Sequence, residues 1–266
     1  FLALPPLPPL SFLLPNPDPP KNCVGFPPPP PPPLPLPLPD ASPCRCRYNP
    51  TMHQTLKVNE IFRSLQGEGT RAGAVCAFVR LTGCNLHCTW CDTRYARTGE
   101  RSMEVRDVLA AVAELHCPRV QVTGGEPLAQ PACLDLLTCL ADAGYEVLLE
   151  TNGSLPIATV DSRVVRIVDF KCPASGESDA NRWANVRHLT ARDEVKFVVA
   201  GRSDFDYAID KTHREQLTRR CTVLFQPVTG RLESTILAGW ILDSGCDVRL
   251  GMQWHKLLWP GRDRGV

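Results

Sequence analysis

The chain has 266 residues, of which 43% are hydrophobic and 21% are charged, and its formal net charge at pH 7 is +1. With so little net charge and no basic stripe, electrostatics argue against a nucleic-acid partner. No apolar run approaches the roughly 18 residues that a membrane-spanning helix needs, so we expect no membrane partner. The 13 cysteines do not indicate a small disulfide-stapled scaffold, because the chain is too long and too rich in helical patterns.

Residues 1–51 are a proline-rich, low-complexity extension that contains 20 of the 27 prolines, including the unbroken run Pro27–Pro33. Such a segment adopts polyproline II but cannot build a hydrophobic core, so we expect it to be disordered. It is either a docking tail or the result of an over-extended reading frame whose real start is Met52. We favour the second interpretation, in which residues 1–51 are not part of the mature protein, because globular-looking sequence follows Met52 at once. Residues 52–266 have a comfortable size for one α/β domain.

After Met52, short β-branched runs alternate with polar and helical segments. Such runs predict strands, because β-branched side chains fit a pleated, half-buried surface. The predicted strands are Val75–Leu81, Val120–Thr123, Val147–Thr151, Val164–Asp169, Val195–Val199, Val223–Gln226 and Val248–Leu250.

Three segments between these runs place apolar residues at helical spacing. The first is Met103–His116, for which Ser102 is the expected N-cap. The second is Pro131–Ala143 and the third is Arg231–Ser244, and a glycine that can end the helix follows each of them.

Alternating strands and helices predict parallel βαβ units, and about six strands indicate an incomplete (β/α)6-type barrel rather than a closed eight-stranded one. In such α/β folds the binding groups gather at the carboxyl ends of the strands. Polar or glycine-rich clusters follow most of the predicted strands, as at Thr123–Pro127, Glu150–Gly153 and Asp169–Pro173. We therefore expect the chemistry of this protein at one rim of the barrel.

The most informative motif is the C-x₃-C-x₂-C run formed by Cys84, Cys88 and Cys91. Three thiolates within eight residues can cap three corners of a [4Fe–4S] cluster, whose usual set is four cysteines, so one iron stays open for another ligand. The alternative is a structural zinc site, but no second Cys or His pair with zinc spacing follows. A cluster-binding triad also favours a reducing compartment, so we expect a cytoplasmic protein.

This cysteine spacing, with Trp90 just before the last cysteine, resembles that of the radical S-adenosylmethionine (SAM) enzymes. The segment Thr123–Pro127 resembles their Gly-Gly-Glu-Pro motif. The resemblance implies a radical SAM barrel in which the open iron binds the methionine part of SAM. Lys171-Cys172-Pro173 departs from the Ser-Pro-Lys of some members, which leaves the SAM contact there open. The SAM-binding residues that the resemblance implies are Trp90, Cys91, Asp92, Gly124, Gly125, Glu126, Lys171 and Gln226.

Further residues resemble one family of radical SAM enzymes, the 7-carboxy-7-deazaguanine synthases. They are the Leu-Gln-Gly-Glu-Gly run of Leu65–Gly69, Arg80, Cys91-Asp92-Thr93 and Gln253–Lys256. The resemblance covers the chain from Asn59 onward. It implies that 6-carboxy-5,6,7,8-tetrahydropterin is converted to 7-carboxy-7-deazaguanine with release of ammonia, in the biosynthesis of 7-deazapurines such as queuosine.

The same resemblance implies roles for particular residues and partners. Arg80 would bind the substrate carboxylate, and Thr93 would bind a Mg²⁺ ion that also engages it. The resemblance also implies an electron donor such as flavodoxin, and it implies that the protein forms a homodimer. The substrate-binding residues that the resemblance implies are Leu65, Gln66, Gly67, Glu68, Arg80, Thr123 and His255.

Two other functions are compatible with parts of the pattern. A glycyl-radical enzyme activase shares the cysteine loop and the glycine motif, but Leu65–Gly69 and Gln253–Lys256 look built for a small planar ligand. A non-catalytic zinc-binding module would leave the glycine-rich strand ends without a purpose. Singly, Glu68 is also compatible with a solvated loop carboxylate, Arg80 with a surface position and His255 with a helix cap.

Overall fold

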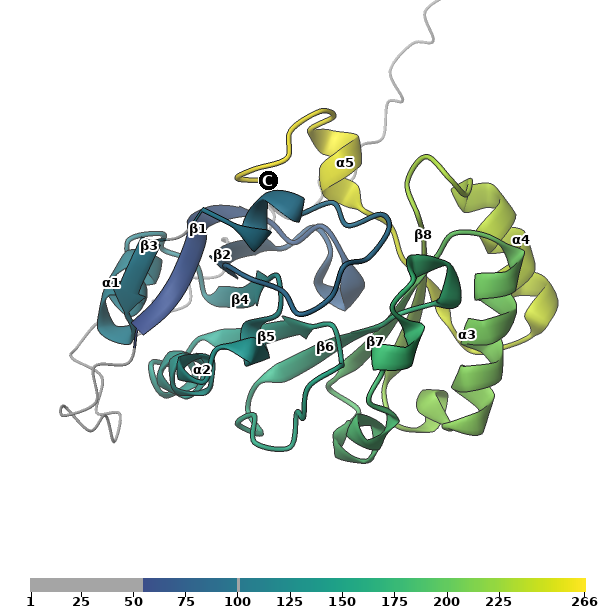
Figure 1. The fold of residues 1–266 in the computed structure, drawn as a ribbon, viewed down its shortest axis with the longest axis horizontal. Coiled ribbons are helices and arrows are strands. Elements are labelled where there is room, and N and C mark those ends of the chain that lie inside the picture. The colour runs from purple at the N-terminus through teal and green to yellow at the C-terminus, as the bar shows by residue number, and fades with distance from the viewer. Residues whose placement is uncertain (1–54, 100) are drawn as a thin grey trace, which may run out of the picture. The chain divides into compact units, whose positions relative to one another are not determined.

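The computed structural model describes residues 55–99 and 101–266 (Figure 1). The expected proline-rich extension, residues 1–51, and the expected start at Met52 lie outside the described residues. No helix within the two described ranges is both long and apolar enough to cross a membrane.

The described strands form one mixed sheet with the order β3-β1-β2-β4-β5-β6-β7-β8-β9. Strand β2 and the strands from β4 to β9 run parallel, whereas β1 is antiparallel to both of its neighbours, β2 and β3. Since β3 and β9 are the two edges, the predicted incomplete barrel is confirmed. The strands are β1 (Thr55–Leu65), β2 (Val75–Leu81), β3 (Arg101–Glu104), β4 (Arg119–Gly124), β5 (Glu146–Thr151), β6 (Val165–Phe170), β7 (Glu194–Val199), β8 (Thr222–Pro227) and β9 (Arg249–Leu250).

All seven predicted strands are present, but β1 and β3 were not predicted. Strand β1 begins with an alternating pattern in which Leu56 and Val58 are buried. A β-bulge then shifts the register between Val58 and Glu60, and the remaining residues are only partly buried or exposed. The bulge breaks the period of two, so the strand pattern is hidden in the sequence.

The described α-helices are α1 (Val105–Ala113), α2 (Ala132–Asp142), α3 (Arg202–Arg214), α4 (Ser234–Ser244) and α5 (Trp254–Leu258). The three predicted helices are α1, α2 and α4. Helix α1 starts later than predicted because Ser102, the expected N-cap, pairs with β1 as part of β3. Helix α3 was missed because it is largely polar and buries Phe205, Ala208 and little else that is apolar.

The two faces of the parallel sheet differ in polarity. In Figure 1, α1, α2, α3 and α4 lie along the outer side of the curved sheet. Outward side chains such as Val79, Val122, Leu149 and Phe197 belong to the main hydrophobic core beneath these helices. Because successive side chains of a strand point to opposite faces, every second position points inward instead. The polar residues at these inward positions are Arg80, Gln121, Thr123, Glu150, Asp169, Lys196 and Gln226.

We expect Phe197→Ala to destabilise the fold strongly. The Phe197 side chain is fully buried, and its ring contacts those of Phe170 and Phe225 at centroid distances of 6.2 and 5.7 Å. Loss of a buried phenyl group costs about 3–5 kcal/mol of the free energy of unfolding. Urea unfolding followed by circular dichroism measures it. The control is Leu242→Ala, since Leu242 is 81% exposed, and equal midpoints for the two variants would contradict this account of the core.

Candidate active site

A cavity of about 530 Å³ lies at the carboxyl ends of the parallel strands. Its walls are the ends of β2 and of β4 to β8, the loop after β1, the cysteine loop after β2, and parts of the segment from Gln253 to Val266. This is the rim at which we expected the chemistry.

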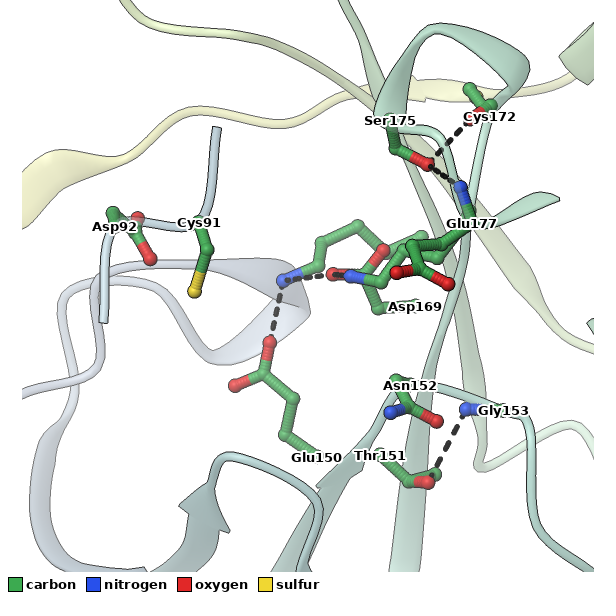
Figure 2. Close-up of polar contacts among 12 residues, drawn as sticks. Cys91, Asp92, Glu150, Thr151, Asn152, Gly153, Asp169, Cys172, Ser175 and Glu177 are labelled. Atoms are coloured by element: carbon green, nitrogen blue, oxygen red, sulfur yellow. Dashed lines mark hydrogen bonds and ion pairs between the residues drawn. The ribbon is translucent and has the colours of Figure 1, made fainter. Parts of the chain in front are cut away.

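The cysteine loop presents all three thiols to this cavity, because Cys84, Cys88 and Cys91 each line it. In Figure 2 the Cys91 sulfur points toward the side where Glu150 lies. The sulfur of Cys84 accepts a hydrogen bond from the backbone N–H of Leu86 over 3.4 Å. The loop is thus wrapped around its own sulfur atoms, as a loop that caps a cluster has to be.

Two glycines let the end of β4 approach the cysteine loop closely. A Cβ atom at Gly124 would lie 2.2 Å from the carbonyl oxygen of Leu81, and one at Gly125 would lie 2.0 Å from that of Gly83. Real side chains do not tolerate such distances to backbone. The glycine pair therefore determines how closely the cysteine loop packs against the end of β4.

The donor set fits a cluster better than a zinc ion. A structural zinc site needs four ligands at tetrahedral geometry from the chain. Among residues 55–99 and 101–266, no group of three or more His, Cys, Asp or Glu side chains is arranged to hold a single metal ion. Three thiols of one loop that share a cavity wall fit three corners of a [4Fe–4S] cluster, with the open iron toward the cavity.

Glu126 differs from the other residues that the glycine motif singled out, because it does not line the cavity. Its carboxylate accepts hydrogen bonds from the N–H of Leu128 (3.0 Å), the hydroxyl of Thr151 (2.8 Å) and the N–H of Asn152 (2.7 Å). Burial raises the pKa of this carboxyl, and the donated hydrogen bonds act against the rise. Glu126 thus ties the end of β4 to the end of β5.

Lys196 is the centre of an ion network inside the sheet. Its ammonium donates to Glu68 over 2.6 Å and to Glu150 over 2.5 Å, and it lies 3.7 Å from Asp169. Lys171 forms a second ion pair with Asp169 at 2.9 Å. Figure 2 shows Glu150 and Asp169 joined through this network.

Lys196 and Glu68 are charged at neutral pH. Burial alone would lower the pKa of Lys196, but Glu150 and Glu68 outweigh it and the pKa is raised well above its usual value. Burial would likewise raise the pKa of Glu68, but the Lys196 ammonium prevails and the pKa is lowered. Lys196 and Glu68 therefore keep each other ionised.

A row of polar side chains crosses the cavity floor. The Gln66 amide donates to the side chain of Gln121, which donates in turn to Glu150 over 2.8 Å. The hydroxyl of Thr123 donates to the same carboxylate oxygen over 3.3 Å. These groups come from β4, β5 and the loop after β1, and together they offer alternating donors and acceptors.

Gln253 joins the C-terminal segment to three other parts of the site. Its amide nitrogen donates to Glu68 (2.9 Å) and to Asp92 (3.1 Å). Its amide oxygen accepts from Thr229 (2.8 Å) and from Lys256 (2.6 Å). Burial would raise the pKa of Asp92, but the neighbouring Lys256 lowers it to about 2.

His255 covers the loop after β1. The backbone N–H of Trp254 donates to the Gly67 carbonyl over 2.9 Å, which fixes α5 beside this loop. A Cβ atom at Gly67 would lie 2.5 Å from the imidazole of His255. The absence of a side chain at Gly67 therefore lets the imidazole close over it.

Arg80 also lines the cavity and is already paired. Its Nε donates to Glu60 over 2.7 Å, and the same carboxylate oxygen accepts from the hydroxyl of Tyr95 over 2.7 Å. The guanidinium carbon lies 5.8 Å from the ring centroids of both Phe62 and Tyr95. The guanidinium is held in one orientation while it lines the cavity.

The cavity brings together the other predicted site residues, and only Glu126 of that set lies outside its lining. Those that line it are Leu65, Gln66, Gly67, Glu68, Arg80, Cys84, Cys88, Trp90, Cys91, Asp92, Thr93, Thr123, Gly124, Gly125, Lys171, Gln226 and His255. Other polar residues of the lining were not predicted as site residues, among them Gln121, Glu150, Asp169, Lys196 and Gln253. Four of these occupy alternate positions within apolar strands, so a test for period-two alternation would have found them.

Comparison with known proteins defines the class. Residues 78–169 match the family model of the radical SAM superfamily. In three dimensions the chain is similar to the crystal structure of QueE from Escherichia coli, with a TM-score of 0.65 and 23% identity over 76% of this chain and 96% of that one. The fold and the cysteine loop are those of a radical SAM enzyme, so the predicted radical SAM barrel is confirmed.

Closer relatives define the family. The chain is 41% identical over 227 residues to the 7-carboxy-7-deazaguanine synthase of Koribacter versatilis. This alignment covers 79% of this chain and 100% of the relative. It is 42% identical over 214 residues to the 7-carboxy-7-deazaguanine synthase of Chlorobaculum tepidum, in an alignment that covers 79% of this chain and 97% of that relative. The chain belongs to the 7-carboxy-7-deazaguanine synthase family. This membership confirms the resemblance seen in the motifs, implies a [4Fe–4S] cluster and SAM as cofactors, and disfavours both an activase and a zinc module.

We expect Gly125→Ala to impair cluster assembly, because the new methyl group would collide with the Gly83 carbonyl and displace the cysteine loop. Iron content and visible absorbance after anaerobic reconstitution measure the effect. The matched control is Gly239→Ala in α4, where a Cβ atom meets nothing within 4 Å. Full iron loading in the Gly125 variant would show that the close approach is not needed.

We expect Lys196→Met to destabilise the protein by about 3–5 kcal/mol, because it leaves buried carboxylates without a counter-charge. The double variant Lys196→Met/Glu150→Gln should recover part of this loss, since one of the carboxylates is then neutral. Denaturant unfolding of the wild type, of Lys196→Met, of Glu150→Gln and of the double variant measures the coupling. Purely additive effects in the double variant would rule out the network as described.

Proposed function

We propose that this chain converts 6-carboxy-5,6,7,8-tetrahydropterin to 7-carboxy-7-deazaguanine with release of ammonia. The observation that carries the proposal is the row Gln66–Gln121–Glu150 with Thr123 on the cavity floor. A reduced pterin presents an edge of alternating donors and acceptors, and this row matches such an edge. Family membership supports the same substrate.

The cofactors are assigned to the side of the cavity that carries the thiols. When bound, the cluster and SAM supply the one-electron chemistry with which hydrogen abstraction begins. Cys84, Cys88 and Cys91 hold the cluster. Gly124 and Gly125 leave room for a ligand to approach the backbone. The remaining residues proposed to contact SAM are Trp90, Asp92, Lys171 and Gln226, whereas Glu126 positions the ends of β4 and β5.

The protein's own residues orient the pterin. Glu68 is held as a carboxylate by Lys196 and accepts hydrogen bonds from the substrate. The backbone groups of Leu65 and Gly67 meet the same edge, and His255 covers the ring and excludes water. Because these groups are paired with one another before the substrate arrives, little ordering is needed on binding.

Arg80 and Thr93 are proposed to receive the substrate carboxylate. Thr93 lines the cavity directly after the last cysteine. Mg²⁺ usually takes one or two protein oxygens and completes its shell with water and substrate oxygens, so one hydroxyl beside a bound carboxylate fits it. We therefore propose that Mg²⁺ binds at Thr93 with the substrate.

Three further expectations belong to this proposal. The triad of free thiols favours a reducing, cytoplasmic compartment. A flavodoxin-type protein is a suitable low-potential electron donor for a cluster of this kind. A homodimer is supported by exposed apolar side chains near the last edge strand, namely Ile236 and Leu250.

The test is an anaerobic assay of the cluster-loaded protein with SAM, dithionite, Mg²⁺ and 6-carboxytetrahydropterin, with 7-carboxy-7-deazaguanine detected by mass spectrometry. We expect product from the wild type and none from Cys88→Ala, because the cluster then lacks a ligand. Cys246→Ala is the control, since Cys246 lies outside the cavity. Removal of Mg²⁺ and Thr93→Val should each lower kcat/KM. A wild type that cleaves SAM but leaves the pterin unchanged would keep the class and exclude this substrate.

A further inference from the structure

Most cations that line the cavity are already paired with a carboxylate of the chain. Two of these cations belong to β2 and β7, one directly follows β6 and one belongs to α5. The pairs are Arg80–Glu60, Lys171–Asp169, Lys196–Glu150 and Lys256–Asp92, at 2.7, 2.9, 2.5 and 3.0 Å.

Arg97 is different. It lines the cavity, yet it forms no ion pair or hydrogen bond among the described residues, and its Nε atom is buried without a partner. Arg262 also lines the cavity, but that residue is exposed, so water can hydrate it. A buried donor without an acceptor costs free energy, and native proteins keep few of them. An acceptor supplied by a ligand would remove this cost.

The position of Arg97 indicates which ligand group this is. Arg97 ends the 3-10 helix η2 (Arg94–Arg97), which follows Thr93 directly. Tyr95 of the same helix lies beneath the guanidinium of Arg80 and donates to Glu60. Arg80, Thr93 and Arg97 therefore belong to one corner of the cavity.

The charge of this corner favours an anion. Arg80 and Glu60 neutralise each other, whereas Arg97 and Arg264, whose guanidinium lies 4.4 Å from the Tyr95 ring centroid, are both positive. A guanidinium offers a planar pair of donors that matches a carboxylate. The helix that carries Arg97 is held in place, because the Ala96 carbonyl accepts from the Gly83 N–H over 2.8 Å.

The carboxylate of SAM is the other anion to consider, but it belongs to the cluster side. The Cys88 thiol has Lys171 and Asp169 as its charged neighbours besides Cys84 and Cys91. A cation next to the cluster is therefore already present in Lys171. Arg97 instead lines the cavity from the short helix that directly follows Thr93.

We propose that Arg97 binds the carboxylate of the pterin substrate and so distinguishes carboxylated pterins from neutral ones. This assignment rests on the proposed function, because it concerns the substrate of that site. Arg80, whose Nε is held by Glu60, keeps its role at the same carboxylate with its other N–H groups, while Arg97 supplies a second fork that no carboxylate of the described residues occupies.

The experiment measures binding without turnover. Cluster-loaded protein with SAM, but without reductant, is titrated with 6-carboxytetrahydropterin and with 6-methyltetrahydropterin, which lacks the carboxylate. We expect Arg97→Gln to raise the Kd of the carboxylated pterin about 10- to 100-fold and to leave the Kd of the methyl pterin and of SAM unchanged. Arg97→Lys should fall between, since it keeps the charge but loses the fork.

The matched control is Arg101→Gln, because Arg101 is exposed on β3 and lies outside the cavity. An equal loss of both pterins in Arg97→Gln would mean a structural role and overturn the proposal. So would a loss confined to SAM, or no loss at all. The wild type could instead bind the carboxylated pterin preferentially through Arg97 but form no 7-carboxy-7-deazaguanine after reduction. That result would exclude the proposed reaction and keep the proposed role of Arg97.

Discussion

The ammonium of Lys196 holds together a sheet interior that is charged rather than apolar. Its side chain is 6% exposed and reaches Glu68 on the loop after β1, Glu150 on β5 and Asp169 on β6. A charge buried to this degree persists only where it is paired and hydrogen-bonded. The positions of three separate segments around the cavity therefore depend on one side chain of β7.

The same network extends to the parts of the molecule that close the cavity. Glu68 accepts from Gln253, whose amide also donates to Asp92 at the end of the cysteine loop. The amide of Gln253 uses both of its donors and both of its acceptor positions in this way. A movement of the C-terminal segment would thus change the positions of both Asp92, beside the thiols, and Glu68, beside the polar floor. The thiol side is assigned to the cofactors and the polar floor to the substrate.

On the opposite side of the sheet the constraint is packing. The outer side chains of the strands form the main core with α1 to α4, and this leaves the inner face free for polar groups. Gly124 and Gly125 then allow β4 to pass against the cysteine loop without any side chain between them. The cavity is therefore shaped by an apolar layer outside, a charged layer inside and a backbone contact between β4 and the loop.

Local patterns were enough for much of this architecture. The β-branched runs became β2 and β4 to β9, and the cysteine spacing with the Gly-Gly-Glu-Pro segment indicated the class of enzyme. Strand β1 was hidden by a bulge that breaks its period, and helix α3 by its polar composition. Glu126 seemed from its motif to face a ligand, but its carboxylate accepts hydrogen bonds from Thr151 and Asn152 at the end of β5 and from the nearby Leu128 N–H.

By itself the sequence determined seven of the nine described strands, three of the five described α-helices and the family, because each of these depends on residues that are close together along the chain. Only the tertiary structure decided that Lys196 pairs with Glu68 across 128 positions and that Gln253 reaches Glu68 across 185. Such partners are chosen by which strand ends meet at the rim. Burial then makes each pairing necessary, because a charged side chain in that interior cannot be hydrated.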